Sequence, residues 1–111
     1  MNGNRRHWPR QQVSVPCLVD TPENGEGASS ARILNICPGG VMLEADQAFM
    51  PGQRLTIVLE HGPDALLFES MGVMTGFVRW NQIADPENPS HYHVGVALER
   101  DLPRRIFMTE H

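Results

Sequence analysis

Residues 12–20 read QVSVPCLVD, and their apolar side chains fall at every second position. Successive side chains of a β-strand point to opposite faces, so this alternation predicts a strand with one buried face. Pro16 lacks an N–H group, and we expect it at an edge or a bulge where no ladder hydrogen bond is needed. The residues expected on the buried face are Val13, Val15, Cys17 and Val19.

The same period of two recurs along the chain and is interrupted by turn-forming residues. This pattern predicts an all-β fold, either a sandwich or a barrel. The intervening segments are rich in Gly, Pro, Asn and Asp, which favour turns and loops, and they cover residues 21–27, 46–53, 61–64 and 81–90. Beyond the first strand, we expect strands over residues 31–36, 41–45, 54–60, 66–70, 73–80 and 91–99.

The end of the chain predicts a short helix that packs back on the strands. Asp101 is a candidate N-cap, and Pro103 would lie in the first turn, where its missing N–H group does no harm. Ile106 and Phe107 would face the core. No internal repeat, linker or second domain is evident, so residues 1–111 are expected to form one domain.

The composition is that of an ordinary soluble globular protein, with 41% apolar and 20% charged residues. A net charge of −4 argues against generic binding to nucleic acid or membrane surfaces, which shows as a basic excess. No apolar run approaches a membrane span and no leader pattern follows Met1, so we expect a cytoplasmic protein without membrane insertion. Cys17 and Cys37 lack C-x-x-C spacing, which indicates free thiols. Since no nucleophile context or phosphate-binding loop is present, neither enzymatic activity nor a cofactor is expected.

Positive charge is concentrated in the segment RRHWPR at residues 5–10, which holds three of the nine cationic side chains. None of the nine is a lysine. The planar guanidinium groups of Arg5, Arg6 and Arg10 can grip a phosphate or a guanine edge through two parallel hydrogen bonds, whereas lysine supplies only a point charge. A small anionic ligand fits this local charge better than a polyanion does. A solvated arm without a ligand is the alternative interpretation.

A second informative segment, NICPGG at residues 35–40, lies at the turn between two expected strands. The paired glycines allow positive φ and leave backbone uncovered by a Cβ atom, so that a ligand can come close. The carboxamide of Asn35 can accept a hydrogen bond from guanine N1–H or N2–H, or donate one to a phosphate. The alternative is a plain hairpin turn without a function.

Taken together, the two segments resemble the PilZ domain, the bacterial receptor module for the second messenger cyclic di-GMP. Arg6 and Arg10 form an R-x-x-x-R arm just before the first strand, and Asn35, Cys37 and Gly40 form a later turn of the type (D/N)-x-S-x-x-G. The resemblance extends over the chain through the Pro-Gly turn at 51–52 ahead of residues 54–59, GFVR at 76–79 and VGV at 94–96.

The resemblance implies a six- or seven-stranded antiparallel β-barrel with a short C-terminal helix and no catalysis. Residues 1–11 would be a mobile ligand-binding arm that becomes ordered when cyclic di-GMP binds. The ordered arm would pass the signal to an unidentified protein effector in the control of motility, pili or exopolysaccharide.

The resemblance also assigns roles to individual residues. Arg6 and Arg10 would clasp the guanines and phosphates, and Asn35 would read a guanine edge. Gly40 would keep the approach open, and Arg5 would add to the local positive potential.

Two positions depart from the commonest family pattern, since Cys37 stands in place of Ser and Asn35 in place of Asp. A thiol is a weaker hydrogen-bond partner than a hydroxyl. We expect the loss of one bond worth about 0.5–1.5 kcal/mol, or about two- to twelvefold in affinity. Asn35 keeps an acceptor oxygen but lacks the negative charge of a carboxylate.

Two other classes of function stay open at this point. A PilZ-fold adaptor that does not bind the nucleotide would work through protein contacts alone. An oligonucleotide-binding barrel would need several exposed aromatic residues in a cationic groove, and it is disfavoured by the seven aromatic residues and the acidic balance, so neither DNA nor RNA is expected as a partner.

The remaining candidates carry weaker signals. Phe77 could stack on a base, but a phenylalanine at such a position is more often part of the core. Arg79 could contact a phosphate or be solvated, and Trp8 could stack on a guanine or pack against the barrel. His91 and His93 share one strand face without a third ligand, so no metal site is expected.

Overall fold

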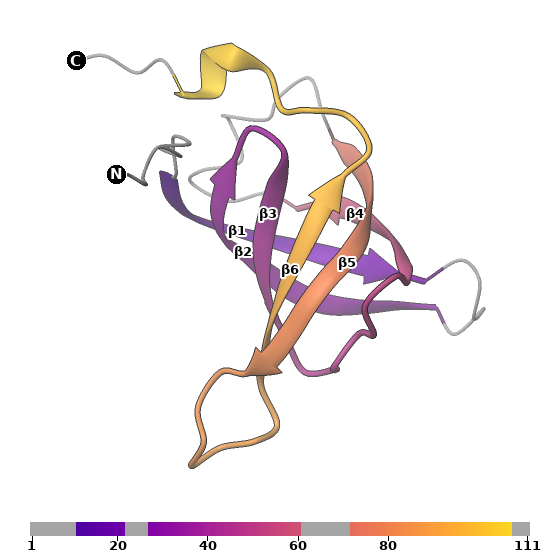
Figure 1. The fold of residues 1–111 in the computed structure, drawn as a ribbon, viewed down its shortest axis with the longest axis vertical. Helices are drawn as coiled ribbons and strands as arrows, with labels where there is room; N and C mark the ends of the chain where they lie inside the picture. Colours follow the sequence, from indigo (N-terminus) through magenta and orange to yellow (C-terminus); the bar gives the residue numbers. More distant parts are fainter. Residues whose placement is uncertain (1–10, 22–26, 61–71, 108–111) are drawn as a thin grey trace, which may run out of the picture.

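The computed structural model describes residues 11–21, 27–60 and 72–107, and these form a closed antiparallel barrel of six strands (Figure 1). Around the barrel the order is β1-β2-β3-β6-β5-β4, and β4 pairs with β1 to close it. The all-β antiparallel barrel predicted from the sequence is therefore confirmed. The strands are β1 (Gln11–Asp20), β2 (Ala28–Cys37), β3 (Gly40–Ala45), β4 (Arg54–Leu59), β5 (Val73–Ile83) and β6 (Tyr92–Leu98).

The alternating apolar residues fill the interior of the barrel. In β1 the four residues predicted for the buried face are all buried, and Val15 and Cys17 are fully so. Each fully buried aliphatic side chain stabilises the fold by about 1.5–3 kcal/mol relative to an exposed one. Other strands and loops complete the core with Ile33, Ile36, Val41, Leu43, Ala45, Phe49, Leu55, Ile57, Met74, Val78, Val94 and Val96.

Pro16 lies where its missing N–H group does least harm. The ladder between β1 and β4 begins only at Cys17, so Pro16 has a ladder partner on one side alone, Arg32 of β2. The Pro16 carbonyl accepts a hydrogen bond from the Glu60 N–H at 2.9 Å. The expected edge position of this proline is therefore confirmed.

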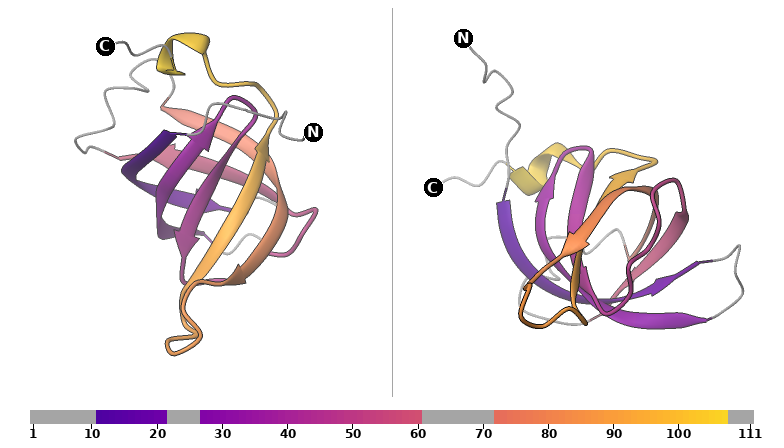
Figure 2. Two further views of the ribbon diagram at one scale, coloured as in Figure 1. Left: turned by 60° about the vertical axis from the view of Figure 1, so that its left-hand side comes forward. Right: turned by 60° about the horizontal axis from the view of Figure 1, so that its bottom comes forward.

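The C-terminal segment covers one end of the barrel, beside the turn between β2 and β3 in both views of Figure 2. Leu102 and Ile106 are 4% and 2% exposed and join the core. The prediction of a helix capped by Asp101 is wrong for the described residues, because they form only a 3-10 helix, η3 (Arg104–Phe107), beginning three residues later. The physical reason is that the Leu102 N–H is already bonded to the Pro38 carbonyl, at 2.7 Å, which holds this segment extended.

Several strand boundaries differ from the expectation. Gln11, assigned to the arm, is the first residue of β1, and β2 begins at Ala28. β5 continues to Ile83, so a loop beginning at residue 81 is wrong: these residues pair with β6, and Asn81 donates from Nδ2 to the Phe49 carbonyl at 2.8 Å. The strand expected at 66–70 lies outside the described residues. Within the described ranges, no helix has the length and hydropathy needed to span a membrane.

Candidate functional site

The strand register shows where the N-terminal arm joins the barrel. Gln11 pairs with Ile36, and Gln12 pairs with Asn35. The chain therefore enters the barrel beside the predicted polar turn. The predicted arm residues Arg5, Arg6 and Arg10 lie outside the described residues.

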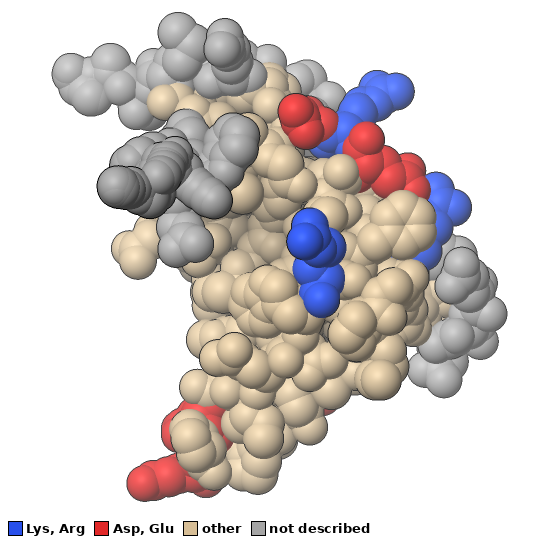
Figure 3. Space-filling model, viewed as in Figure 1, with Lys and Arg blue, Asp and Glu red and all other residues tan. Residues whose placement is uncertain are grey.

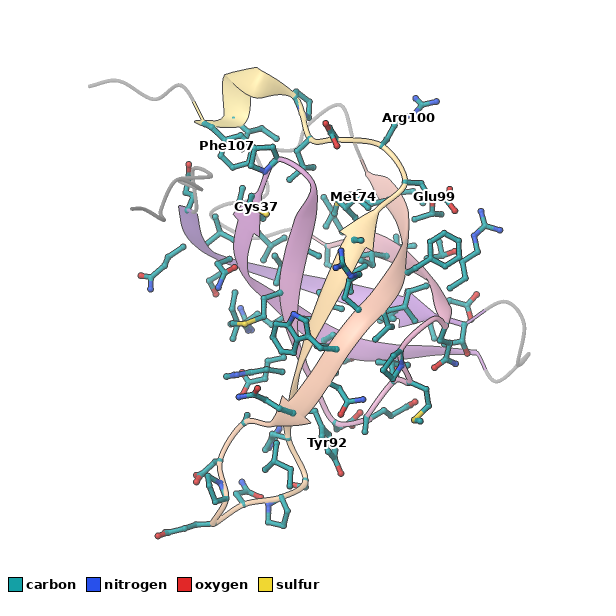
Figure 4. The ribbon with its side chains drawn as sticks, viewed as in Figure 1. Cys37, Met74, Tyr92, Glu99, Arg100 and Phe107 are labelled. Carbon is teal, nitrogen blue, oxygen red and sulfur yellow. The ribbon has the colours of Figure 1, made fainter. Side chains whose placement is uncertain are left out.

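The structure brings together the three turn residues predicted for the site. Asn35 and Cys37 are half-buried on the outer side of β2, on either side of the fully buried Ile36. Cys37 pairs directly with Gly40 across the turn. Cys37 lies at the end of β2, beneath the C-terminal segment that carries Phe107 (Figure 4).

Gly40 serves a purpose other than the one expected from the sequence. Neither Gly39 nor Gly40 adopts positive φ, so the expectation of left-handed backbone at this turn is wrong. A Cβ atom on Gly40 would lie 2.5 Å from the Val96 carbonyl oxygen, closer than real Cβ contacts come. Glycine is therefore required here because β3 and β6 approach closely, and the space above Gly40 is filled by protein backbone.

The turn is fixed by its hydrogen bonds to the C-terminal side of β6. The Leu98 N–H donates to the Gly39 carbonyl at 2.9 Å, and the Leu102 N–H donates to the Pro38 carbonyl at 2.7 Å. A Cβ atom on Gly39 would lie 3.8 Å from Oδ1 of Asp101, which places a carboxylate at the tip of the turn. A negatively charged ligand is therefore favoured on the outer surface of β2 and β3, away from this tip.

Asn35 has a weak hydrogen-bond partner. Among the described residues, the hydrogen bond of its side chain is the one from Nδ2 to Sδ of Met42, at 3.9 Å. A thioether is a poor acceptor, so most of the hydrogen-bonding capacity of this carboxamide stays available to a ligand. The amide can exchange this contact for a guanine edge at little cost.

Cross-strand pairing extends this position into a line of outward-facing residues, which we call the outer row. Directly paired residues of neighbouring strands place their side chains on the same face, about 4.5–5.5 Å apart. Asn35 pairs with Met42, Met42 with Gly95, and Gly95 with Trp80. The outer row thus crosses five strands through Gln12, Asn35, Met42, Gly95 and Trp80.

The surface over β5 and β6 is nearly free of charge (Figure 3). Arg79 is the sole charged residue in these two strands. The ladder between β5 and β6 skips it, since Val78 pairs with Val96 and Trp80 with Gly95. This bulge turns both Arg79 and Trp80 outward, and both are exposed.

Phe77 lies on the outside of the barrel, so the expectation of a core position is wrong. It is 42% exposed, as is Trp80. The interior positions of this part of β5 are taken by Met74, Gly76 and Val78. The alternation visible in the sequence fits this arrangement, and Gly76 as an interior position is what obscured it.

The two thiols differ in environment. Cys17 is fully buried in the core, and this burial, together with the nearby Glu60 carboxylate, raises the pKa of its thiol to about 12, despite the opposing effect of Arg32. Cys37 is half-buried at the turn. Both are free, as expected from their spacing.

Among the residues that the structure describes, no group of three or more His, Cys, Asp or Glu side chains is arranged to hold a metal ion. His91 is exposed and His93 is half-buried on the outer side of β6.

A closed six-stranded antiparallel barrel, with a polar turn beside the entry of its N-terminal segment, has the architecture of a small receptor or adaptor domain. The family model of the PilZ domain matches residues 4–107, and the chain belongs to the PilZ domain family. PilZ domains are receptor or adaptor domains and not enzymes.

One solved structure with a similar fold is the Bacillus subtilis inhibitor of motility, MotI/DgrA, at a TM-score of 0.62 and 15% sequence identity. The match covers 93% of this chain and 46% of that chain, so this chain spans about half of that protein's length. At this level of identity the likeness shows the fold alone. A search of curated proteins gives no match.

Proposed function

We propose that this protein is a cyclic di-GMP receptor whose N-terminal arm closes over the ligand at Asn35 and passes the signal to a protein partner. The observation that carries the proposal is the register of β1 and β2, with Gln11 opposite Ile36 and Gln12 opposite Asn35. It joins the R-x-x-x-R arm to the barrel beside the residues of the (D/N)-x-S-x-x-G turn. Membership of the PilZ family supports cyclic di-GMP as the ligand.

The chemistry of the two segments is complementary. Cyclic di-GMP carries two negative charges, and the guanidinium groups of Arg6 and Arg10 offer paired donors to phosphates and to guanine O6 and N7. Asn35 offers an acceptor oxygen to guanine N1–H and N2–H. The Asp101 carboxylate at the tip of the turn repels phosphates, which directs them toward the arm.

Signal transfer follows from the ordering of the arm. A ligand that binds the arm and the barrel together favours the closed arrangement by its differential affinity for that state. The closed arm and the ligand then form a surface that the free protein lacks, and a partner recognises this surface. The structural neighbour is named an inhibitor of motility, which supports motility control as the first process to test, ahead of pilus or exopolysaccharide control.

The test is a calorimetric titration of the protein with cyclic di-GMP, repeated with Arg6→Ala and Arg10→Ala. We expect micromolar or tighter binding in the parent and a loss of about tenfold or more in each variant, because each removes a charged hydrogen-bond donor. Arg100→Ala is the matched control, since it removes the same charge from a side chain that points away from the barrel (Figure 4). Its affinity should stay within about twofold of the parent, a change of less than about 0.5 kcal/mol.

A second candidate is a PilZ-fold adaptor that does not bind the nucleotide. The observation in its favour is Cys37 at the position of the family's serine. Heats of injection equal to those of dilution in the parent protein would establish this alternative. Equal losses in Arg100→Ala and the two arm variants would show that net charge, and not the arm, governs binding.

A further inference from the structure

The outer row ends in an aromatic side chain that lies over a glycine. A Cβ atom on Gly95 would overlap the indole ring of Trp80, at atoms Cε2, Nε1 and Cζ2. The ring therefore lies over β6, one strand from Met42. Met42 in turn contacts the amide of Asn35. The indole, the thioether and the carboxamide thus follow one another along the surface of the barrel.

Gly95 has no role of its own in the backbone that explains its presence. It lies inside β6, is buried and does not adopt positive φ. Glycine within a strand interior costs roughly 0.5–1 kcal/mol relative to alanine, so its retention requires a compensating contact. That contact is the indole ring of Trp80, which is seated flat enough to fill the place of a side chain.

Trp80 keeps 42% of its surface exposed while it is seated in this way. Its neighbourhood is uncharged apart from Arg79. An exposed indole, held in one position by the strand beneath it, offers a flat apolar surface for a planar base. A neighbouring guanidinium adds positive charge that suits the phosphates of a nucleotide.

We propose that Trp80 is the base-stacking residue of the binding site, on which one guanine of the dinucleotide lies while Asn35 hydrogen-bonds a guanine from the other part of the outer row. This inference rests on the proposed function and adds to it a residue outside the arm and the turn. Met42 forms the floor between the two contacts. Because every base has a π face, Trp80 contributes affinity, and selection for guanine stays with Asn35 and the arm.

Fluorescence provides the most direct test. The chain has two tryptophans, so Trp8→Phe leaves Trp80 as the sole one. Titration of this variant with cyclic di-GMP should change the Trp80 emission in a saturable manner, with a midpoint equal to the calorimetric Kd. Saturating ligand that leaves the emission unchanged would overturn the inference.

Affinity provides the second test. Trp80→Leu should weaken binding by about fivefold to about 100-fold, as for the loss of one stacked base. Phe77→Leu is the matched control, because Phe77 lies on the same strand with the same exposure but outside the outer row. It should change the affinity by less than about twofold. Equal losses in both variants would show that the apolar face acts as a whole, and would also overturn the inference.

Gly95→Ala separates stacking from a role in stability. The added Cβ atom displaces the indole without removing it. The variant should bind about as weakly as Trp80→Leu, and the double variant should bind no more weakly than either. If Trp80→Leu does not fold, as judged by thermal melting, the Trp8→Phe titration and Gly95→Ala decide the matter.

The outcomes also separate the inference from the proposed function. A parent protein that does not bind cyclic di-GMP contradicts the proposed function, whatever the variants do. A parent that binds, together with a folded Trp80→Leu variant of unchanged affinity, contradicts the stacking role alone.

Discussion

Two polar regions on the outside of the barrel differ in how far their groups satisfy one another. On one side, Nε of Arg54 lies 3.2 Å from Oε2 of Glu99, and the Thr75 hydroxyl donates to Oε1 of the same carboxylate at 2.9 Å. In the outer row, the Asn35 amide donates only to a thioether sulfur, at 3.9 Å. Figure 3 shows opposite charges side by side in the first region and a wide uncharged surface in the second. A group with strong partners serves the fold, whereas one with a weak partner is free to serve a ligand.

The largest effect that tests this comparison is expected from Asn35→Ala. It removes a hydrogen-bond partner of guanine and should weaken cyclic di-GMP binding about tenfold, measured by calorimetry. The free energy of unfolding should hardly change, because only a thioether contact is lost.

Glu99→Ala is the matched opposite of Asn35→Ala, since it removes a well-partnered side chain (labelled in Figure 4). It should leave ligand affinity unchanged and lower the free energy of unfolding by no more than about 1 kcal/mol, because the ion pair is partly exposed and screened. Denaturant melts measure this change. An effect of Glu99→Ala on binding as large as that of Asn35→Ala would break the distinction between the two regions.

A smaller effect of opposite sign is expected from Cys37→Ser. The hydroxyl restores a hydrogen-bond partner beside Asn35, and binding should tighten by about two- to twelvefold. The measurement is the same titration, with Cys37→Ala as the control for simple loss of the thiol. If the serine variant binds no better than the parent, Cys37 does not face the ligand.

The smallest effect at neutral pH is expected at the other thiol. The pKa of Cys17 is raised in the fold from 9.0 to about 12, mainly by burial. Below pH 9 both the folded and the unfolded state carry the protonated thiol, so its titration contributes no pH dependence. As the pH rises from about 9 toward about 12, the unfolded state loses the proton first, and the free energy of unfolding decreases.

Cys17→Val should remove this decrease while it preserves the packing. Denaturant melts of the parent and the variant between pH 8 and roughly pH 11, within the window set by the two pKa values, measure the difference. Parallel pH profiles for the two proteins would contradict the assignment of this pH dependence to Cys17.

The strands with regular alternation could be predicted from the sequence because one buried face leaves a direct record in it. In β1 and β4 the apolar residues fall at every second position, and the structure buries them. Two arginines and a turn pattern were sufficient to indicate the family, since they are spaced along the chain and need no knowledge of pairing. The roles predicted for these residues stay predictions.

The outer row could not be predicted, because it depends on register between strands that are distant in the sequence. The bulge at Arg79 shifts the outward face of β5 by one residue, and no local pattern in GFVRWNQ marks that shift. Gly95 and Trp80 are far apart in the chain, and only the pairing of β5 with β6 places one over the other. For the same reason, the crowding of Gly40 by the Val96 carbonyl was not visible, and the glycine was assigned to ligand access.

Closure of the barrel limits how this domain can recognise a protein. Every one of its six strands has a neighbour on both sides, since β1 pairs with β4 as well as β2. An extended peptide cannot add itself as a seventh strand along a free edge, which is a common mode of recognition for open sheets. A partner must instead read side chains, and its specificity is therefore open to change by single substitutions on the surface without any rearrangement of the sheet.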